Sequence, residues 1–326
     1  MKTAIHRAAM RFAALATLMF IATAVLAQSY PAKPIRYIVP TSTGTPPDIV
    51  GRLIAARLQA ALGQPVIVDN RPGASQAIGI GELVKLPADG YTLLGVSMPN
   101  SVLPSLFSKL PFDLRKDLAP VGQFSWSSNV LVVGVDEEAR SARALVGLTK
   151  AHPNRYSFAS GGNGTPAHLS GELFKLQSGA DVQHVPYNQF SQAAADVIAA
   201  RVQFMFMASV AAIAQINGGK LRALAVTGPH RLSALPQVPT MIEQGFPNFD
   251  VRDWQGLVVR DGTPAPIVAR LNAELDRVLK QSDVREHLAK LGADIQGGSP
   301  EDFRKLIDAE IDRWAKVVKA AGITPE

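Results

Sequence analysis

The amino-acid sequence predicts an α/β protein of two lobes joined by two crossing segments. Apolar, β-branched runs alternate with stretches of helical periodicity, and this alternation is typical of a mainly parallel sheet flanked by helices. It occurs in two blocks of the chain, which the long extended runs 121–135 and 249–259 connect. We expect a ligand site between the two lobes, at the carboxyl ends of the parallel strands.

The first block forms the predicted lobe 1. Residues 35–40 are predicted as a strand, and apolar residues then recur at helical spacing from Ile49 until Gly63 ends the helix. Further strands are predicted at 66–68 and 91–96.

The second block repeats this order and forms the predicted lobe 2. Its expected helices are 142–151, 167–177 and 192–200, and its expected strands are 156–159, 182–186, 202–207 and 221–227. Two closing helices, capped by Thr263 and Ser299 and each beginning with a proline, are expected to return to lobe 1. Lobe 1 is therefore expected to comprise 28–125 and 256–326, and lobe 2 to comprise 126–255.

The composition excludes several classes of function. The chain has no cysteine, which rules out a disulfide scaffold and a thiolate metal or redox site. Its 33 basic and 27 acidic residues are scattered without a basic cluster, which argues against nucleic-acid binding. The histidines lack the spacing of metal ligands, so we expect neither a metal site nor a cofactor.

The first 27 residues have the layout of a secretory signal peptide. Basic residues at Lys2, Arg7 and Arg11 precede an apolar stretch over 12–26, and a small-residue cleavage pattern ends at Ala27. The apolar stretch is shorter than the ~20 residues that span a membrane. We expect cleavage after Ala27 and export of a mature protein that does not itself span the membrane.

Two loops that follow predicted strands are candidates for ligand binding. The first opens a helix with Thr45 at the N-cap, where free N–H groups and the helix dipole favour an anion. A well-capped helix start is an equally good interpretation of this loop. Its candidate residues are Thr41, Ser42, Thr43, Gly44, Thr45 and Asp48.

The second loop has Thr165 as its predicted N-cap. Its glycines would let a ligand approach the backbone closely, and Asn163 and Thr165 add side-chain donors. A G-x-G-x-x-A pattern is present, but the acidic residue of a dinucleotide site is missing after the next strand. His168 is more often an orienting partner than a catalytic base at such a place. Tyr187, at the end of a later strand, either faces the cleft or packs.

Specific motifs extend from about Tyr30 to Gly322. They include Tyr30-Pro31-x-Lys33-Pro34-Ile35-Arg36, Leu62-Gly63-Gln64-Pro65-Val66, Asp69-Asn70-Arg71-Pro72-Gly73-Ala74, Ala88-Asp89-Gly90-Tyr91-Thr92-Leu93, Gly162-Asn163-Gly164-Thr165, Val185-Pro186-Tyr187 and Leu235-Pro236-x-Val238-Pro239-Thr240. Together they resemble the solute-binding proteins of the tripartite tricarboxylate transporter system, the Bug (Bordetella uptake gene) family.

The resemblance implies a monomeric periplasmic binding protein of the type II-like fold, a Venus flytrap that closes on a small carboxylated solute and docks transiently to membrane transporter subunits. It implies no catalytic residue. In the family, the two loops hold a ligand carboxylate. Carried over, and with Tyr187 added, the ligand-binding residues are Thr41, Ser42, Thr43, Gly44, Thr45 and Asp48 in one lobe, and Ser160, Gly162, Asn163, Gly164, Thr165 and His168 in the other.

The chain departs from the family pattern at the first loop, which usually reads Phe-Pro-Pro-Gly-Gly. Here the aromatic residue is absent, and Pro46 and Pro47 each remove an N–H group. Met207 also replaces a common aspartate. The identity of the solute therefore stays open, and two alternative functions remain: a ligand sensor that signals to a membrane partner, and a hydrolytic or acid–base enzyme that uses Asp48 and His168.

Export provides the first test. Expressed in a bacterial host that has a periplasm, the protein is expected in the periplasmic fraction with Gln28 as its first residue, because the signal peptide is removed after Ala27. N-terminal sequencing and intact mass of the fraction measure this. A protein that retains Met1 in the membrane fraction would contradict the prediction.

Overall fold

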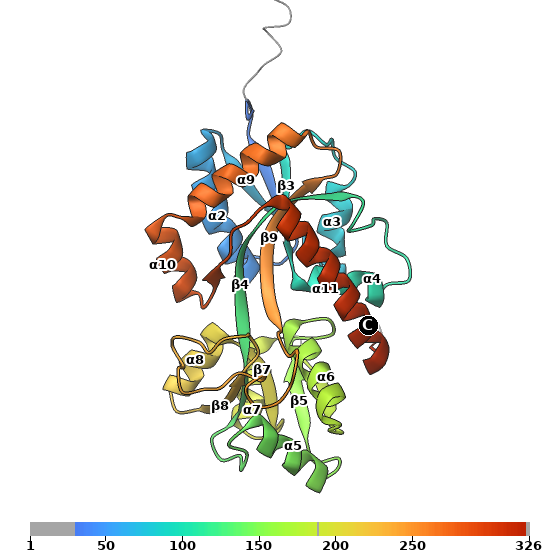
Figure 1. Ribbon diagram of the computed structural model, residues 1–326, viewed down its shortest axis with the longest axis vertical. Helices are drawn as coiled ribbons and strands as arrows, with labels where there is room; N and C mark the ends of the chain where they lie inside the picture. The colour runs from blue at the N-terminus through green and yellow to red at the C-terminus, as the bar shows by residue number, and fades with distance from the viewer. Residues whose placement is uncertain (1–29, 188, 324–326) are drawn as a thin grey trace, which may run out of the picture.

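The computed structural model describes residues 30–187 and 189–323 of the chain. The predicted signal peptide and its cleavage site after Ala27 lie outside the described residues. The described chain forms two lobes, one above the other in Figure 1, with two long strands running between them. The predicted two-lobed α/β fold is confirmed.

Six strands form the sheet of the upper lobe. They are β1 (Ile35–Val39), β2 (Val66–Asn70), β3 (Thr92–Ser97), β4 (Leu118–Gly134), β9 (Arg252–Arg260) and β10 (Asp294–Ile295). β1 lies between β2 and β3 and is parallel to both. β9 pairs antiparallel with β3 and with β4, and β10 adds to β4.

The sheet of the lower lobe shares β4 with the upper one. It adds β5 (Ser157–Ser160), β6 (Gln183–Pro186), β7 (Phe204–Ala208) and β8 (Leu221–Val226). β5 lies between β6 and β7 and is parallel to both, whereas β4 pairs antiparallel with β7 and β8. Each lobe thus has three mutually parallel strands, which agrees with the predicted mainly parallel sheets. The fourth strand predicted in lobe 2, β8, pairs antiparallel with β4, and the crossing strands add further antiparallel pairs that the sequence pattern did not reveal.

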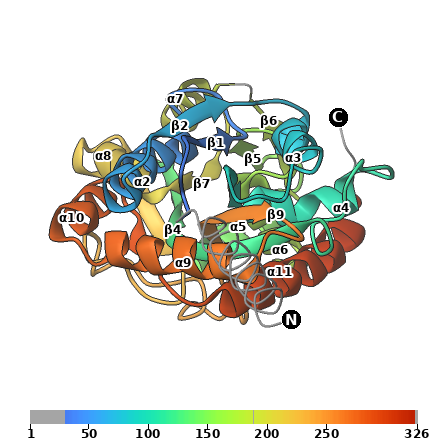
Figure 2. The same ribbon diagram turned by 90° about the horizontal axis from the view of Figure 1, so that it is seen from above.

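Ten α-helices flank the sheets within the described residues. They are α2 (Pro46–Leu62), α3 (Ala77–Leu83), α4 (Leu103–Leu106), α5 (Ala142–Ala151), α6 (Pro166–Ser178), α7 (Phe190–Ile198), α8 (Ser209–Asn217), α9 (Ala265–Leu279), α10 (Ser282–Lys290) and α11 (Pro300–Ala321). Seen from above, α9, α10 and α11 lie along one side of the molecule, with β2 and α3 toward the other (Figure 2). The sequence analysis did not predict α3, α4, α8 or α10.

The helix ends follow the residues that the sequence singled out, except at the predicted caps Thr45 and Thr263. Thr45 occupies the N-cap of α2 but makes no side-chain capping hydrogen bond. Gly63 ends α2 in the left-handed conformation at φ 69°, and Ser299 and Asp302 form a capping box at α11. Thr263 does not cap α9, because its hydroxyl donates to the carbonyl of Arg260 at 2.7 Å. Pro264 takes the cap position instead, so α9 begins one residue later than predicted.

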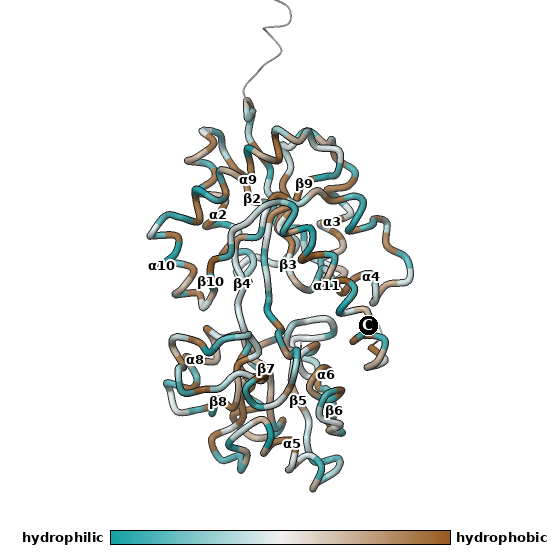
Figure 3. Tube along the Cα trace, viewed as in Figure 1, coloured by the Kyte–Doolittle hydropathy of each residue, from teal (hydrophilic) through white to brown (hydrophobic). Residues whose placement is uncertain are grey.

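The strand β4 belongs to the sheets of both lobes, and β9 runs beside it between them. β4 pairs with β9 from Leu118 to Ser128, and it pairs with β7 and β8 from Asn129 onward. Figure 3 shows hydrophilic residues where β9 passes between the lobes. This polar passage lies in the extended run 249–259, which was expected from the sequence to connect the two lobes.

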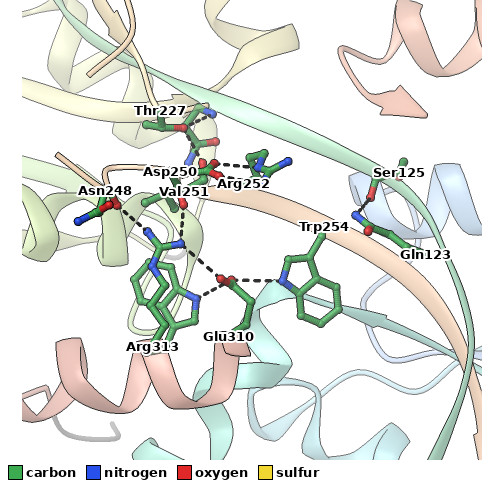
Figure 4. A network of polar contacts seen from close by, with 12 residues as sticks. Gln123, Ser125, Thr227, Asn248, Asp250, Val251, Arg252, Trp254, Glu310 and Arg313 are labelled. Carbon is green, nitrogen blue, oxygen red and sulfur yellow. Dashed lines mark hydrogen bonds and ion pairs between the residues drawn. The ribbon is translucent and has the colours of Figure 1, made fainter. Parts of the chain in front are cut away.

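The C-terminal helix α11 fastens one face of the crossing strands. Buried Glu310 accepts hydrogen bonds from Nε1 of Trp254 in β9 (3.3 Å) and from Nε1 of Trp314 in α11 (2.9 Å). Arg313 pairs with Glu310 at 3.3 Å and donates to the carbonyl of Asn248 at 3.2 Å (Figure 4). Because α11 also packs against α6, it contacts both lobes. From the sequence, contacts with lobe 1 alone were expected.

The shared acceptor of two indoles should matter for stability. Glu310→Ala leaves two buried N–H groups without an acceptor, at roughly 1–3 kcal/mol each, so we expect unfolding to cost about 2–4 kcal/mol less. Glu301→Ala, at the exposed start of the same helix, is the control and should change the value by less than about 1 kcal/mol. Urea unfolding of both variants measures this, and equal losses would contradict the assignment.

Candidate functional site

A cavity of about 440 Å³ lies between the two lobes. Its walls come from the loops after β1, β3, β5 and β7 and from both crossing strands. The order of the strands reverses at β1 and again at β5, and ligands of open α/β sheets bind at such reversals. The cavity is therefore the candidate binding site, as the sequence predicted.

Three helices begin at this cavity. Residues of the first turn of α2 (Pro46, Pro47), of α6 (Pro166) and of α8 (Ser209, Val210) line it. The N-terminus of a helix carries a partial positive charge from the aligned peptide dipoles. Three such ends at one cavity favour a negatively charged group there.

The side chain of Asp48 stabilises the loop after β1. This buried carboxylate accepts hydrogen bonds from the N–H of Gly44 (2.9 Å) and from Nδ2 of Asn70 (2.8 Å), and it pairs with Arg52 at 3.0 Å. Burial by itself would raise the pKa of Asp48, but the hydrogen bonds from Arg52, Gly44 and Asn70 outweigh it and hold the pKa below its usual value. Asp48 therefore shapes the loop as an ionised brace.

Hydroxyl groups order the part of this loop that faces the cavity. Thr45 Oγ1 donates to the carbonyl of Ser42 at 2.8 Å and lies 2.9 Å from Thr41 Oγ1. The Thr41 hydroxyl can rotate, so its proton can be directed either to Thr45 Oγ1 or to a ligand in the cavity. Both Thr41 and Thr45 line the cavity.

The loop after β5 is held by two histidines. Ser160 Oγ lies 2.6 Å from Nε2 of His184, and the N–H of Gly164 donates to Nδ1 of His168 at 3.1 Å. The two imidazole rings stack with centroids 4.1 Å apart. Burial lowers the pKa of His168 to about 3 and that of His184 to about 4, so both rings are neutral near pH 7.

Thr165 closes the same loop. Its hydroxyl donates to the carbonyl of Gly162 at 2.7 Å and accepts from the N–H of His168 at 3.4 Å, which makes Thr165 the predicted cap of α6. The side chain lines the cavity at the same time.

The structure divides the thirteen predicted binding residues into three groups and Tyr187, which stands apart. Thr41, Thr45 and Thr165 line the cavity, while Ser42, Thr43, Gly44, Gly162, Asn163 and Gly164 belong to the same two loops without lining it. Asp48, Ser160 and His168 are buried supports of the loops, and the Tyr187 hydroxyl donates to Asp196 at 2.8 Å. Which of these residues touch a ligand stays a prediction.

The crossing strands supply polar residues that the sequence analysis did not name as binding residues. Ser127 and Asn129 of β4 and Asp253 and Gln255 of β9 line the cavity. Positions two apart on a strand lie on one face, so this spacing of polar residues within the extended runs was the available signal. From the sequence, those runs were predicted only as crossings between the lobes.

Asp253 is the one ionisable side chain among the described residues that line the cavity. Its Oδ1 is shielded from solvent and has no hydrogen-bond partner among the described residues, although the carboxyl group accepts a bond from the backbone of Met98. Burial raises the pKa of Asp253 to about 7. Oε1 of Gln255 is likewise shielded and without a partner there.

Apolar side chains lie around the same cavity. Ile49, Phe190 and Val210 line it and are 40%, 42% and 39% exposed. Partly exposed apolar side chains of this size are suited to cover the hydrocarbon part of a ligand.

Two further features bear on the type of protein. Within 30–187 and 189–323, no group of His, Asp or Glu side chains is arranged to hold a metal ion. None of the helices in this part of the chain combines the length and the apolar character needed to cross a membrane.

Two α/β lobes, two crossing strands and a cavity at the ends of the parallel strands define the class of two-lobed solute-binding proteins. The family model of the tripartite tricarboxylate transporter family receptor matches residues 41–323, and the chain therefore belongs to that family. The family is one of receptors, so the protein is a solute-binding receptor and not an enzyme.

Individual relatives agree with this membership. Protein BugT of Bordetella pertussis is 38% identical over 93% of this chain and 95% of its own. A Rhodopseudomonas palustris protein solved with adipate is 32% identical over 91% of this chain and 100% of its own, with a TM-score of 0.80. MatC of the same organism, solved with malate, is 31% identical over 89% and 100%, with a TM-score of 0.76.

The raised pKa of Asp253 predicts a pH-dependent gain of stability in Asp253→Asn. The unfolded carboxyl titrates near pH 3.9 and the folded one near 7, so the folded state binds more protons between these values and loses stability as the pH rises through them. Asparagine removes this loss. The increase in melting temperature should therefore be larger at about pH 8 than at about pH 5.

Asp261→Asn is the control for this measurement, because Asp261 is exposed just beyond β9 and its replacement makes the same change of net charge. Its melting temperature should follow that of the unmodified protein at both pH values. An increase in the melting temperature of Asp253→Asn that is the same at both pH values would contradict the raised pKa of Asp253.

Proposed function

We propose that this protein is exported to the periplasm, captures a small carboxylated solute in the cavity between its lobes and delivers it to membrane subunits of a tripartite uptake system. The observation that carries this proposal is the meeting of three helix N-termini at one cavity. The adipate and malate of the two related structures support it, because both are small carboxylates.

In the proposed site, helix N-termini and hydroxyl groups bind the carboxylate without a positively charged side chain. Each helix end contributes about 0.3–1 kcal/mol to an exposed anion and up to about 2 kcal/mol to a partly buried one. Pro46, Pro47 and Pro166 remove backbone donors from two of these ends. With these backbone donors missing, we expect the hydroxyl of Thr41 to donate a hydrogen bond to the carboxylate in their place.

Capture works by closure of the two lobes in a monomer. We place lobe 1 at 28–125 and 256–326 and lobe 2 at 126–255; the partners of β4 change close to the first of these boundaries, between Ser128 and Asn129. Closure about the crossing strands would bring the loop of Thr41 toward the loop of Thr165. The closed form would then present both lobes together to the membrane subunits.

The acid–base alternative has no support in the geometry. Asp48 holds the loop of the upper lobe and His168 that of the lower lobe, and neither lines the cavity. Each is occupied by hydrogen bonds within its own loop.

Thr41→Val tests the proposed carboxylate site. A hydrogen bond to a charged group contributes roughly 1.5–3 kcal/mol, so we expect the affinity to fall about tenfold or more. Thr43→Val makes the same change in the same loop at a residue that does not line the cavity, and it should cost less than about threefold. Titration calorimetry measures this with adipate, malate or the carboxylate that native mass spectrometry finds on protein purified without unfolding.

The same titrations at low and high salt test whether a positively charged side chain takes part in binding the carboxylate. Affinity should change little, because no Lys or Arg is among the described residues that line the cavity. Equal losses in both variants, or a steep salt dependence, would place the carboxylate elsewhere.

A further inference from the structure

We propose that Asp253 and Gln255 form a subsite for a positively charged amine, so that the solute is an amino-carboxylate and not a simple di- or tricarboxylate. This inference rests on the proposed function for the carboxylate end of the solute. It assigns the opposite end to the crossing strand β9, which none of the predicted binding loops includes.

The two side chains are placed to act together. They are two residues apart on β9, so they lie on the same face of the strand, roughly 7 Å apart along it, and both line the cavity. Oδ1 of Asp253 and Oε1 of Gln255 are each shielded from solvent and lack a hydrogen-bond partner among the described residues. Two neighbouring acceptors without donors are unfavourable in the empty site, and a donor-bearing solute would satisfy both.

An ammonium group fits these acceptors better than a hydroxyl group does. A hydroxyl has one proton to donate, whereas an ammonium has three, enough to donate to more than one acceptor. It also has the charge that the site lacks, because Asp253 is the sole ionisable side chain among the described lining residues. A second carboxylate at this place would instead meet an acidic group.

The rest of the cavity agrees with a solute of two unlike ends. The helix N-termini of α2, α6 and α8 favour its negative end. Ile49, Phe190 and Val210 offer apolar surface for the carbon chain between the ends. The electrical asymmetry of the cavity thus matches a zwitterion.

Matched series of straight-chain carboxylates test the inference. The probes are monocarboxylates, dicarboxylates and carboxylates with an amine at the far end, for example hexanoate, adipate and 6-aminohexanoate. Thermal shift selects the best chain length of each series, and titration calorimetry at neutral pH gives its affinity. We expect the best amino-carboxylate to bind about tenfold or more tightly than the best member of the other two series.

Asp253→Asn keeps the shape of the side chain and removes its charge. It should reduce the preference for the amine to less than about threefold, whereas the matched control Asp261→Asn should leave it unchanged. The comparison of probes on the unmodified protein does not depend on the folding of either variant.

The outcomes separate this inference from the proposed function. Binding of carboxylates with no preference for an amine, or a preference that survives in Asp253→Asn, overturns the amine subsite and leaves the proposed function standing. Binding of no probe from any series overturns both. An amine preference that is lost in Asp253→Asn alone supports the subsite.

Discussion

The antiparallel pairing of β4 with β9 is the constraint on which the rest of the structure depends. Because the pair runs from Leu118 opposite Arg260 to Ser128 opposite Arg252, both strands leave the upper sheet together and reach the lower one side by side. Their backbone groups satisfy each other across the gap, so the passage can carry polar side chains without exposing an unpaired strand. One face of the pair lines the cavity, and α11 holds the other through Glu310.

The sequence was a good guide wherever a pattern was local and periodic. Gly63 ends α2 and Ser299 begins α11 because a positive φ and a capping box each favour particular residue types. The helix α8 was not predicted, since its Ser-Val-Ala-Ala-Ile-Ala-Gln-Ile-Asn sequence has little polar contrast around the helix. The antiparallel partners of β4 depend on contacts between distant parts of the chain, which no local pattern reveals.

In the candidate site, too, local patterns predicted some residues, and others depend on contacts between distant parts of the chain. Helix-opening loops have a recognisable signature of Thr followed by Pro, and this identified Thr41, Thr45 and Thr165, which line the cavity. The family resemblance led to Asp48 and His168 as well, but their hydrogen bonds turn both side chains toward the loops that they support. The polar spacing in the run of β9 was a signal for Asp253, but the pairing of β9 with β4 was needed to show that this face of the strand meets the cavity.

The cavity combines two electrostatic features of opposite sign. Helix dipoles favour a negative group on the side of the loops, while Asp253 and Gln255 present acceptors from the crossing strand. Burial raises the pKa of Asp253 to about 7, so its ionisation destabilises the free protein near neutral pH. A side chain that served packing alone would not need to be acidic. A cationic group beside Asp253 would lower that pKa again and turn the unfavourable charge into a favourable pair. The cost of Asp253 to the free protein and its selectivity for a solute are thus two consequences of the same buried carboxyl group.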